Sequence, residues 1–148
     1  MPDVTLTRQG SVLGNFTVTY PTTWSIEERR NGQIAVLAPP AGKGRLRLIA
    51  MADEQPPAAL TRVYAEAVCT RALRSIGLQA NVRAIRRISP DQMTVLSAGV
   101  AAGTSIVEIV HVFRTGQVVA AFFRAPSTDA HFSTATRIMK SLRMKPGP

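Results

Sequence analysis

The sequence predicts a single α+β domain in which an antiparallel β-sheet of about six to seven strands is flanked by two main helices. Short segments of alternating apolar and polar residues recur along the chain, as in strands with one buried face. Two longer segments instead repeat apolar residues every three or four positions, as in amphipathic helices. The helices do not alternate with the strands one for one, which favours an antiparallel sheet over a doubly wound parallel one.

The amino-terminal part contains two predicted strands. Apolar residues alternate with threonines over residues 4–6, and a second segment runs from residues 12–13 into Phe16, Val18 and Tyr20, with Gly10 and residues 14–15 expected as turns. Pro21 ends this segment because proline has no N–H to donate to a neighbouring strand. The only tryptophan, Trp24, follows three residues later. Its ring is suited either to core packing at a strand corner or to lining a ligand cleft.

Two further strands are predicted before the first helix. Residues 34–38 form a short apolar run that stops at Pro39. Residues 45–51 begin by alternating arginine with leucine. We therefore expect Leu46 and Leu48 to face the core and the arginines beside them to face water.

The first predicted helix spans Leu60–Ile76. Asp53 or Gln55 is expected to cap it, Pro56 fits its first turn, and Gly77 is a natural stop. Apolar residues spaced by three and four are expected to form its core face: Leu60, Val63, Tyr64, Ala67, Val68, Ala72 and Ile76.

Four more strands are predicted in the second half. Residues 82–88 are basic and are expected to form an edge strand, where charge discourages pairing with another sheet. Residues 93–101 follow. Residues 105–114 and 118–124 flank a short turn and are expected to form a hairpin at the centre of the sheet, because they are rich in Val, Ile and Phe.

A second helix closes the domain. Ser127 or Thr128 is expected to cap it, and Asp129 suits the positive end of its dipole. Its predicted core face consists of Phe132, Ala135, Ile138, Met139 and Leu142. Basic residues follow near its carboxyl end, where the helix dipole favours them: Arg137, Lys140, Arg143 and Lys145.

Length and composition fit one globular domain over residues 1–148, with residues 1–3 and 145–148 as flexible ends. No apolar run is long enough to span a membrane, and no secretion signal is visible. We therefore expect a cytoplasmic protein, with an exported or periplasmic form that has lost its signal as the alternative. Cys69 is the only cysteine, which excludes an internal disulfide.

A net charge of +9, from 18 Lys and Arg against 9 Asp and Glu, is the strongest global signal. It favours an acidic partner: nucleic acid, anionic lipid or an acidic protein surface. The alternative is that the charge only keeps a small domain soluble. The basic residues form no single block, and aromatic residues make up only 5% of the chain, which disfavours nucleic acid because few rings are available for base stacking.

The pattern resembles the PsbP/DcrB-like fold, which includes the Mog-type Ran-binding proteins. The resemblance covers nearly the whole chain: the strand and corner Phe16–Trp24, the central helix Leu60–Ile76 and the terminal helix Phe132–Leu142. It implies a sheet flanked by helices and a mostly non-catalytic, partner-binding role. It transfers no functional residue to this chain.

Candidate chemistry is sparse. His111 lies in an apolar run, and Glu108, three residues away, is expected on the opposite face of a strand, so a satisfied core histidine is favoured over a base. His131 is expected to be solvated and Cys69 to be a buried structural thiol. Residues 42–44 lack the spacing of a phosphate-binding loop and fit a hairpin tip. The sequence contains no cofactor motif and no metal constellation.

The sequence therefore predicts a non-enzymatic binding module whose partner is a protein. A type VI secretion accessory (an effector chaperone or an immunity protein), a basic nucleic-acid-binding domain and a hydrolase using His111 are the alternatives, and a homodimer is compatible with each. The residues expected to contact the partner are Arg45, Arg47, Arg83, Arg86, Arg87 and Trp24.

Overall fold

The computed structural model describes residues 8–12, 15–29, 33–52 and 56–144. The strand predicted over residues 4–6 and the cap predicted at Asp53 or Gln55 lie outside these residues. In the described part of the chain the elements are β1 (Arg8–Val12), β2 (Phe16–Tyr20), β3 (Ser25–Arg29), β4 (Ile34–Ala38), β5 (Arg45–Ala52), α1 (Arg62–Ser75), β6 (Val82–Ser89), β7 (Gln92–Ala101), β8 (Thr104–Phe113), β9 (Gln117–Pro126), α2 (Phe132–Lys140) and β10 (Arg143–Met144).

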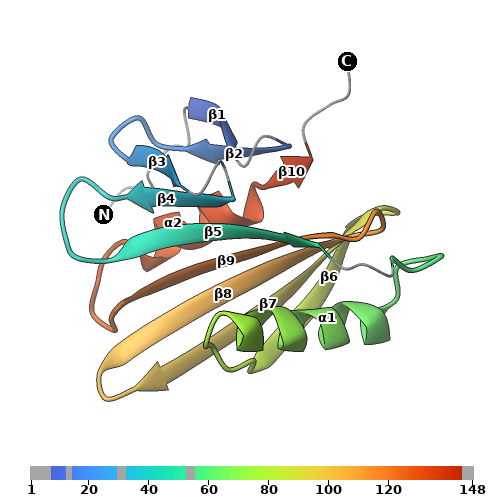
Figure 1. The fold of residues 1–148 in the computed structure, drawn as a ribbon. Coiled ribbons are helices and arrows are strands. Elements are labelled where there is room, and N and C mark those ends of the chain that lie inside the picture. The colour runs from blue at the N-terminus through green and yellow to red at the C-terminus, as the bar shows by residue number, and fades with distance from the viewer. Residues whose placement is uncertain (1–7, 13–14, 30–32, 53–55, 145–148) are drawn as a thin grey trace.

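The strands form two antiparallel sheets, so the predicted α+β class is confirmed, although the strands do not all join one sheet (Figure 1). The large sheet has seven strands in the order β3-β4-β5-β9-β8-β7-β6. The predicted edge position of β6 and the predicted hairpin of β8 and β9 near the centre are both confirmed. The small sheet has the order β1-β2-β10, with β10 only two residues long.

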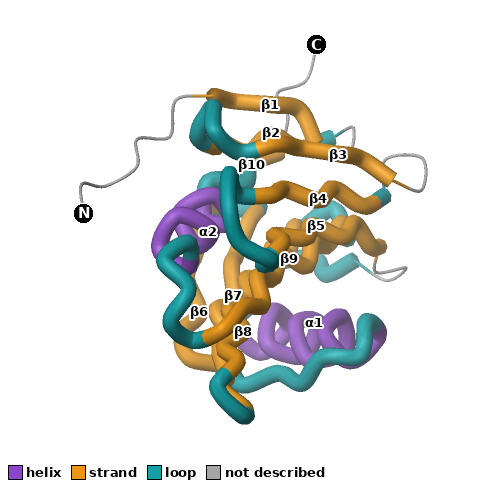
Figure 2. Tube along the Cα trace, turned by 90° about the vertical axis from the view of Figure 1, so that its left-hand side faces the viewer, coloured by secondary structure: helices purple, strands orange, loops and turns teal. Residues whose placement is uncertain are grey.

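The two helices lie on opposite faces of the large sheet (Figure 2). Helix α1 packs on β6, β7, β8 and β9, and α2 packs between β8 and β9 on one side and β2 on the other. Each interface has its own apolar core. In the described residues neither helix has the length and apolar character needed to cross a bilayer.

The core on the α2 side contains the aromatic residues of β2 and of the corner that follows it. Phe16 packs against Phe113 with ring centroids 5.2 Å apart, and Trp24 lies 6.4 Å from Phe123. Phe132 of α2 meets Phe123 edge-on at 5.1 Å. These rings join both sheets and α2 in one continuous apolar layer.

The buried face of α1 is rotated from the predicted stripe. The residues buried against the sheet are Ala65, Val68, Cys69, Ala72 and Leu73. Val63, predicted to face the core, is 80% exposed, and Ala67 is also exposed. Small side chains predominate at the contact, which lets the helix axis approach the sheet closely. Apolar residues occur on both sides of this stripe, so spacing alone did not fix its centre.

Both ends of α1 are fixed by specific caps. Thr61 is the N-cap, so the prediction of Asp53 or Gln55 was wrong, and the Thr61 side chain accepts a hydrogen bond from the Tyr64 N–H at 3.1 Å. Pro56 precedes the helix instead of lying in its first turn. Gly77 has φ +80°, and the Leu78 N–H donates to the Leu73 carbonyl at 2.8 Å. This left-handed stop confirms the prediction for Gly77.

Helix α2 begins later than its predicted caps. Its N-cap is His131, without a side-chain capping bond, so the prediction of Ser127 or Thr128 was wrong. Asp129 accepts a hydrogen bond from the His131 N–H at 2.8 Å, which satisfies one backbone group at this end. Strands β1 and β3 were not predicted. Gly10 was expected as a turn but pairs with Val18 within β1, so that prediction was wrong. Strand β3 was missed because Ile26 is the only apolar residue of this exposed edge strand and it shows no alternation.

Candidate functional site

His111 is a structural residue that joins β8 to the end of α2. It is fully buried, and its Nε2 lies 2.8 Å from the Met139 carbonyl, which can only accept, so Nε2 bears the hydrogen. The Gln92 amide donates to His111 Nδ1 and to the Leu142 carbonyl, both at 3.1 Å. Burial lowers the pKa of His111 to about 4. With both ring nitrogens occupied, this neutral imidazole is not available as a general base.

Cys69 is also unsuited to nucleophilic chemistry. Its side chain is buried on the sheet-facing side of α1. Burial, with the nearby negative charges of Glu108 and Glu66, raises the pKa of the Cys69 thiol to about 12. The thiol therefore stays protonated at neutral pH, and the thiolate is the reactive form.

His131 and Asp129 form a half-buried pair at the start of α2. The distance from His131 Nδ1 to Asp129 Oδ1 is 2.8 Å, and the side chains are 25% and 11% exposed. Sequence analysis expected a solvated His131, but its ring meets Trp24 edge-on at 6.0 Å. Within the described residues, no hydroxyl or thiol group is hydrogen-bonded to His131, so the pair lacks a nucleophile to activate.

The described residues contain no group of three or more His, Cys, Asp or Glu side chains that could hold a metal ion. Residues 42–44 lie between the antiparallel strands β4 and β5, as predicted for a hairpin tip. Gly44 packs so closely on Phe123 that an added Cβ would lie 2.6 Å from the ring. The glycine therefore serves packing on the α2 side of the sheet.

The α1-side face of the large sheet is only partly covered. Helix α1 ends before the β7–β8 hairpin, which extends past it (Figure 1). Side chains alternate along a strand, so residues two apart from those packed under α1 continue the same face toward this end. We call this surface the open face; it consists of Arg45, Arg47, Ile106, Glu108, Phe122 and Arg124.

Arginines on neighbouring strands meet on the open face. Arg45 of β5 is paired directly with Arg124 of β9, and Arg47 is paired with Phe122. Like charges placed directly opposite each other destabilise a sheet. The Arg45 side chain donates hydrogen bonds to the Gly42 and Gly44 carbonyls, whereas the side chains of Arg47 and Arg124 have no hydrogen bond or ion pair of 4 Å or less to another described residue. The open face therefore has three arginines, and the acid on it is buried Glu108, the diagonal neighbour of Arg124.

Glu108 lies at the inner end of the open face and is 1% exposed. The Asn81 N–H donates to Ser97 Oγ at 2.8 Å, so the Ser97 hydroxyl hydrogen is free to donate to Glu108 Oε1 at 2.9 Å. Glu108 Oε2 has no hydrogen-bond partner among the described residues. Burial raises the pKa of Glu108, and the Ser97 hydrogen bond and the charge of Arg124 partly oppose this rise.

An open cleft of about 920 Å³ borders Glu108. Its polar lining combines residues from the segment between α1 and β6 with residues of the sheet: Gln79, Asn81, Arg83, Thr104, Ser105, Glu108 and Arg124. The cleft and the open face share Glu108 and Arg124. A buried carboxylate and exposed arginines therefore meet at the edge of one hollow.

The structure brings together only part of the predicted partner-binding set. Arg45 and Arg47 lie side by side on the open face, and Arg83 lines the cleft. Arg86 pairs with Thr94, whose strand neighbours Met93 and Val95 pack under α1, so Arg86 faces the α2 side. Arg87 and Trp24 have structural positions instead.

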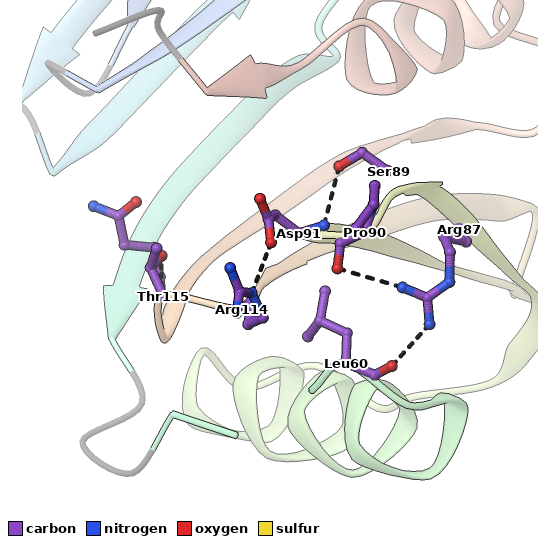
Figure 3. A network of polar contacts seen from close by, with 8 residues as sticks. Leu60, Arg87, Ser89, Pro90, Asp91, Arg114 and Thr115 are labelled. Atoms are coloured by element: carbon purple, nitrogen blue, oxygen red, sulfur yellow. Dashed lines mark hydrogen bonds and ion pairs between the residues drawn. The ribbon is translucent and has the colours of Figure 1, made fainter. Parts of the chain in front are cut away.

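Arg87 fixes the start of α1 to the β6–β7 turn (Figure 3). Its guanidinium donates to the Leu60 carbonyl at 2.8 Å and to the Pro90 carbonyl at 3.5 Å. In the same turn, Asp91 forms an ion pair with Arg114 at 2.7 Å. Trp24 is 3% exposed in the α2-side core, so the prediction that its ring contacts a partner does not fit its position.

Sequence reasoning missed Arg124 and the role of Glu108. The alternation of β9 could have placed Arg124 on the same face as Phe122 and Ala120. The pairing of Arg45 with Arg124, however, joins residues far apart in sequence, and no local pattern encodes that register. Glu108 was considered only as a partner for His111, which does lie on the opposite face of β8, as predicted.

No known family model and no curated protein sequence matches this chain. Several solved structures are similar in fold. One is a crystal structure from Bacteroides thetaiotaomicron VPI-5482, with a TM-score of 0.57 and 16% sequence identity over 96% of this chain. This chain spans 50% of that protein's length. At this identity the similarity concerns the fold alone.

Proposed function

We propose that the protein is a non-catalytic binding module whose open face receives an acidic segment of a partner protein. The observation that supports this most strongly is the direct cross-strand pairing of Arg45 with Arg124, extended by Arg47 on the same face. A sheet that places like charges opposite each other gains stability when an anionic group lies between them. The resemblance to PsbP/DcrB-like accessory proteins implies the same kind of role.

The state of the titratable groups also favours binding over catalysis. The imidazole of His111 is neutral and has both nitrogens occupied, and the Cys69 thiol is buried and protonated at neutral pH. A protein partner is favoured over nucleic acid because Trp24 and Tyr20 are buried in the core and Phe122 is the aromatic residue on the open face. Stacking of successive bases needs several accessible rings.

Binding of a labelled hexaglutamate peptide, followed by fluorescence anisotropy at low and moderate salt, tests the proposal. We expect saturable binding that weakens with salt, because exposed charges supply much of the attraction. The variant Arg45→Glu/Arg47→Glu should lower the affinity at least about tenfold, since it replaces attraction by repulsion. A labelled single-stranded oligonucleotide of equal charge serves as the competing probe.

The matched control is Arg86→Glu/Lys140→Glu, which changes the net charge equally but away from the open face. Arg86 faces the α2 side of β6, and Lys140 is exposed at the end of α2. Equal loss of affinity in both variants would show that only net charge matters. Tighter binding of the oligonucleotide than of the peptide would indicate that the partner is a nucleic acid and not a protein.

A type VI secretion accessory is a narrower form of the same proposal. It adds a specific expectation, a one-to-one complex with the product of a neighbouring gene that survives moderate salt. Size-exclusion chromatography of the two co-expressed chains tests this expectation, with Arg45→Glu/Arg47→Glu as the variant that should prevent complex formation.

A further inference from the structure

We propose that the cleft beside Glu108 binds a small zwitterion of the amino-acid type, with its ammonium group on Glu108 and its carboxylate on Arg124 and Arg83. This site goes beyond the proposed protein-binding function. The cleft shares Glu108 and Arg124 with the open face, but Arg83 lines the cleft alone, and Arg45 and Arg47 lie outside it.

The first observation is a buried carboxylate, one oxygen of which has no hydrogen-bond partner among the described residues. Glu108 is 1% exposed, and Ser97 occupies only Oε1. The Ser97 hydroxyl accepts from the Asn81 N–H and donates its single hydrogen to Oε1, so it has no hydrogen to offer Oε2. A buried oxygen without a partner costs free energy. A ligand N–H group that enters the cleft would remove that cost.

The second observation is the placement of positive charge beside this oxygen. Glu108 is paired with Phe122, and Ile106 is paired with Arg124, so Arg124 is the diagonal neighbour of Glu108 on the same face. Diagonal neighbours in an antiparallel pair lie about 7 Å apart. Arg124 forms no ion pair of 4 Å or less with Glu108 in the described structure. Arg83 lines the same cleft.

These charges select for a ligand that has both signs. A simple cation would be repelled by Arg83 and Arg124, and a simple anion would meet the carboxylate of Glu108. In an amino acid the ammonium and carboxylate groups are fixed within a few bonds of each other, a spacing that fits between Glu108 and Arg124. The cleft volume of about 920 Å³ lies within the range of small-molecule sites, and Gln79 and Asn81 add hydrogen-bonding groups.

Isothermal titration calorimetry of the full chain tests the proposal with three probes of similar size: β-alanine, propionate and propylammonium. We expect β-alanine to bind at least about tenfold more tightly than either singly charged probe. Glu108→Gln should reduce β-alanine binding at least about tenfold, because the neutral amide cannot pair with the ammonium group. Arg124→Gln should reduce it similarly through the carboxylate.

Two outcomes would overturn the proposal. The first is that β-alanine at millimolar concentration gives no heat of binding. The second is that propionate binds as tightly as β-alanine and that Glu108→Gln has no effect, which would identify an anion site. Arg45→Gln/Arg47→Gln, which places no acid opposite Arg124, should leave β-alanine binding intact while weakening hexaglutamate binding, so failure of this site and failure of the proposed peptide-binding function are distinguishable. Circular dichroism confirms that each variant is folded.

Discussion

The two faces of the large sheet differ in how fully their buried polar groups are hydrogen-bonded. On the α2 side, the buried imidazole of His111 and the amide of Gln92 form hydrogen bonds to each other and to two carbonyls at the end of α2. On the α1 side, Oε2 of buried Glu108 has no hydrogen-bond partner in the described part of the chain, and Arg45 is paired with Arg124 across strands. The first arrangement stabilises the fold, whereas the second costs stability, and such a cost is typical of binding sites.

Gln92→Leu should disrupt the hydrogen bonds on the α2 side of the sheet and give the largest loss of stability. The substitution leaves His111 Nδ1 buried without a donor and removes one of the two donors to the Leu142 carbonyl, which keeps the Arg143 guanidinium at 2.7 Å. An unsatisfied buried group costs about 1–3 kcal/mol and a lost hydrogen bond about 1 kcal/mol more, so we expect a loss of about 2–4 kcal/mol in the free energy of unfolding. Urea denaturation measures it. The exposed Gln79→Leu is the control and should change stability by less than about 0.5 kcal/mol; equal effects would refute the hydrogen-bond account.

Acid should remove the stabilisation that neutral His111 provides. The pKa of His111 is about 4 in the folded protein, below its usual value of 6.5, because burial opposes the charged form. A lowered folded-state pKa means that stability is present above pH 6.5 and is lost as the pH falls toward 4. The loss amounts to about 3 kcal/mol.

Urea denaturation of the wild type and of His111→Gln at several pH values isolates this term. The stability advantage of the wild type should shrink as the pH falls from 6.5 to 4. An advantage independent of pH over that range would mean that His111 titrates normally and that its burial does not hold it neutral.

The elements themselves were largely predictable, and the contrast between the faces was not. Periodicity identified both helices and most strands, because burial of one face leaves a local pattern. The rotation of α1, which exposes Val63, depends on how small residues fit the sheet. The proximity of Arg45 to Arg124 depends on strand register, and the length of α1 relative to β8 determines how much of the sheet stays open.

A pair of glycine substitutions compares packing on the two sides. An alanine Cβ at Gly44 would lie 2.6 Å from Phe123 and 3.2 Å from Ala125, so Gly44→Ala should cost about 2 kcal/mol through overpacking. At Gly99, which lines the cleft, the nearest atom would be 3.8 Å away on Ile106. Gly99→Ala should therefore be nearly neutral. Thermal unfolding of both variants measures the difference, and equal costs would contradict the tight and open packing described for the two sides.

Glu108→Gln should raise stability at neutral pH by about 1 kcal/mol, the smallest effect. Burial raises the pKa of Glu108, so the folded protein disfavours its charged form. A raised folded-state pKa means that wild-type stability is lost as the pH rises above 4.5. The advantage of the variant should thus vanish in acid, as urea denaturation at several pH values can show. Destabilisation at neutral pH would mean that the charge of Glu108 supports the fold.

Amide chemical-shift mapping by NMR, with hexaglutamate added to the labelled full chain, tests the central claim most directly. If the open face is the binding surface, the largest shifts should fall on β5 near Arg45 and Arg47 and on β9 near Phe122 and Arg124. The α2 side, including His111 and Gln92, should be unaffected. Shifts concentrated on α2 or spread over all basic residues would contradict the assignment of binding to the open face.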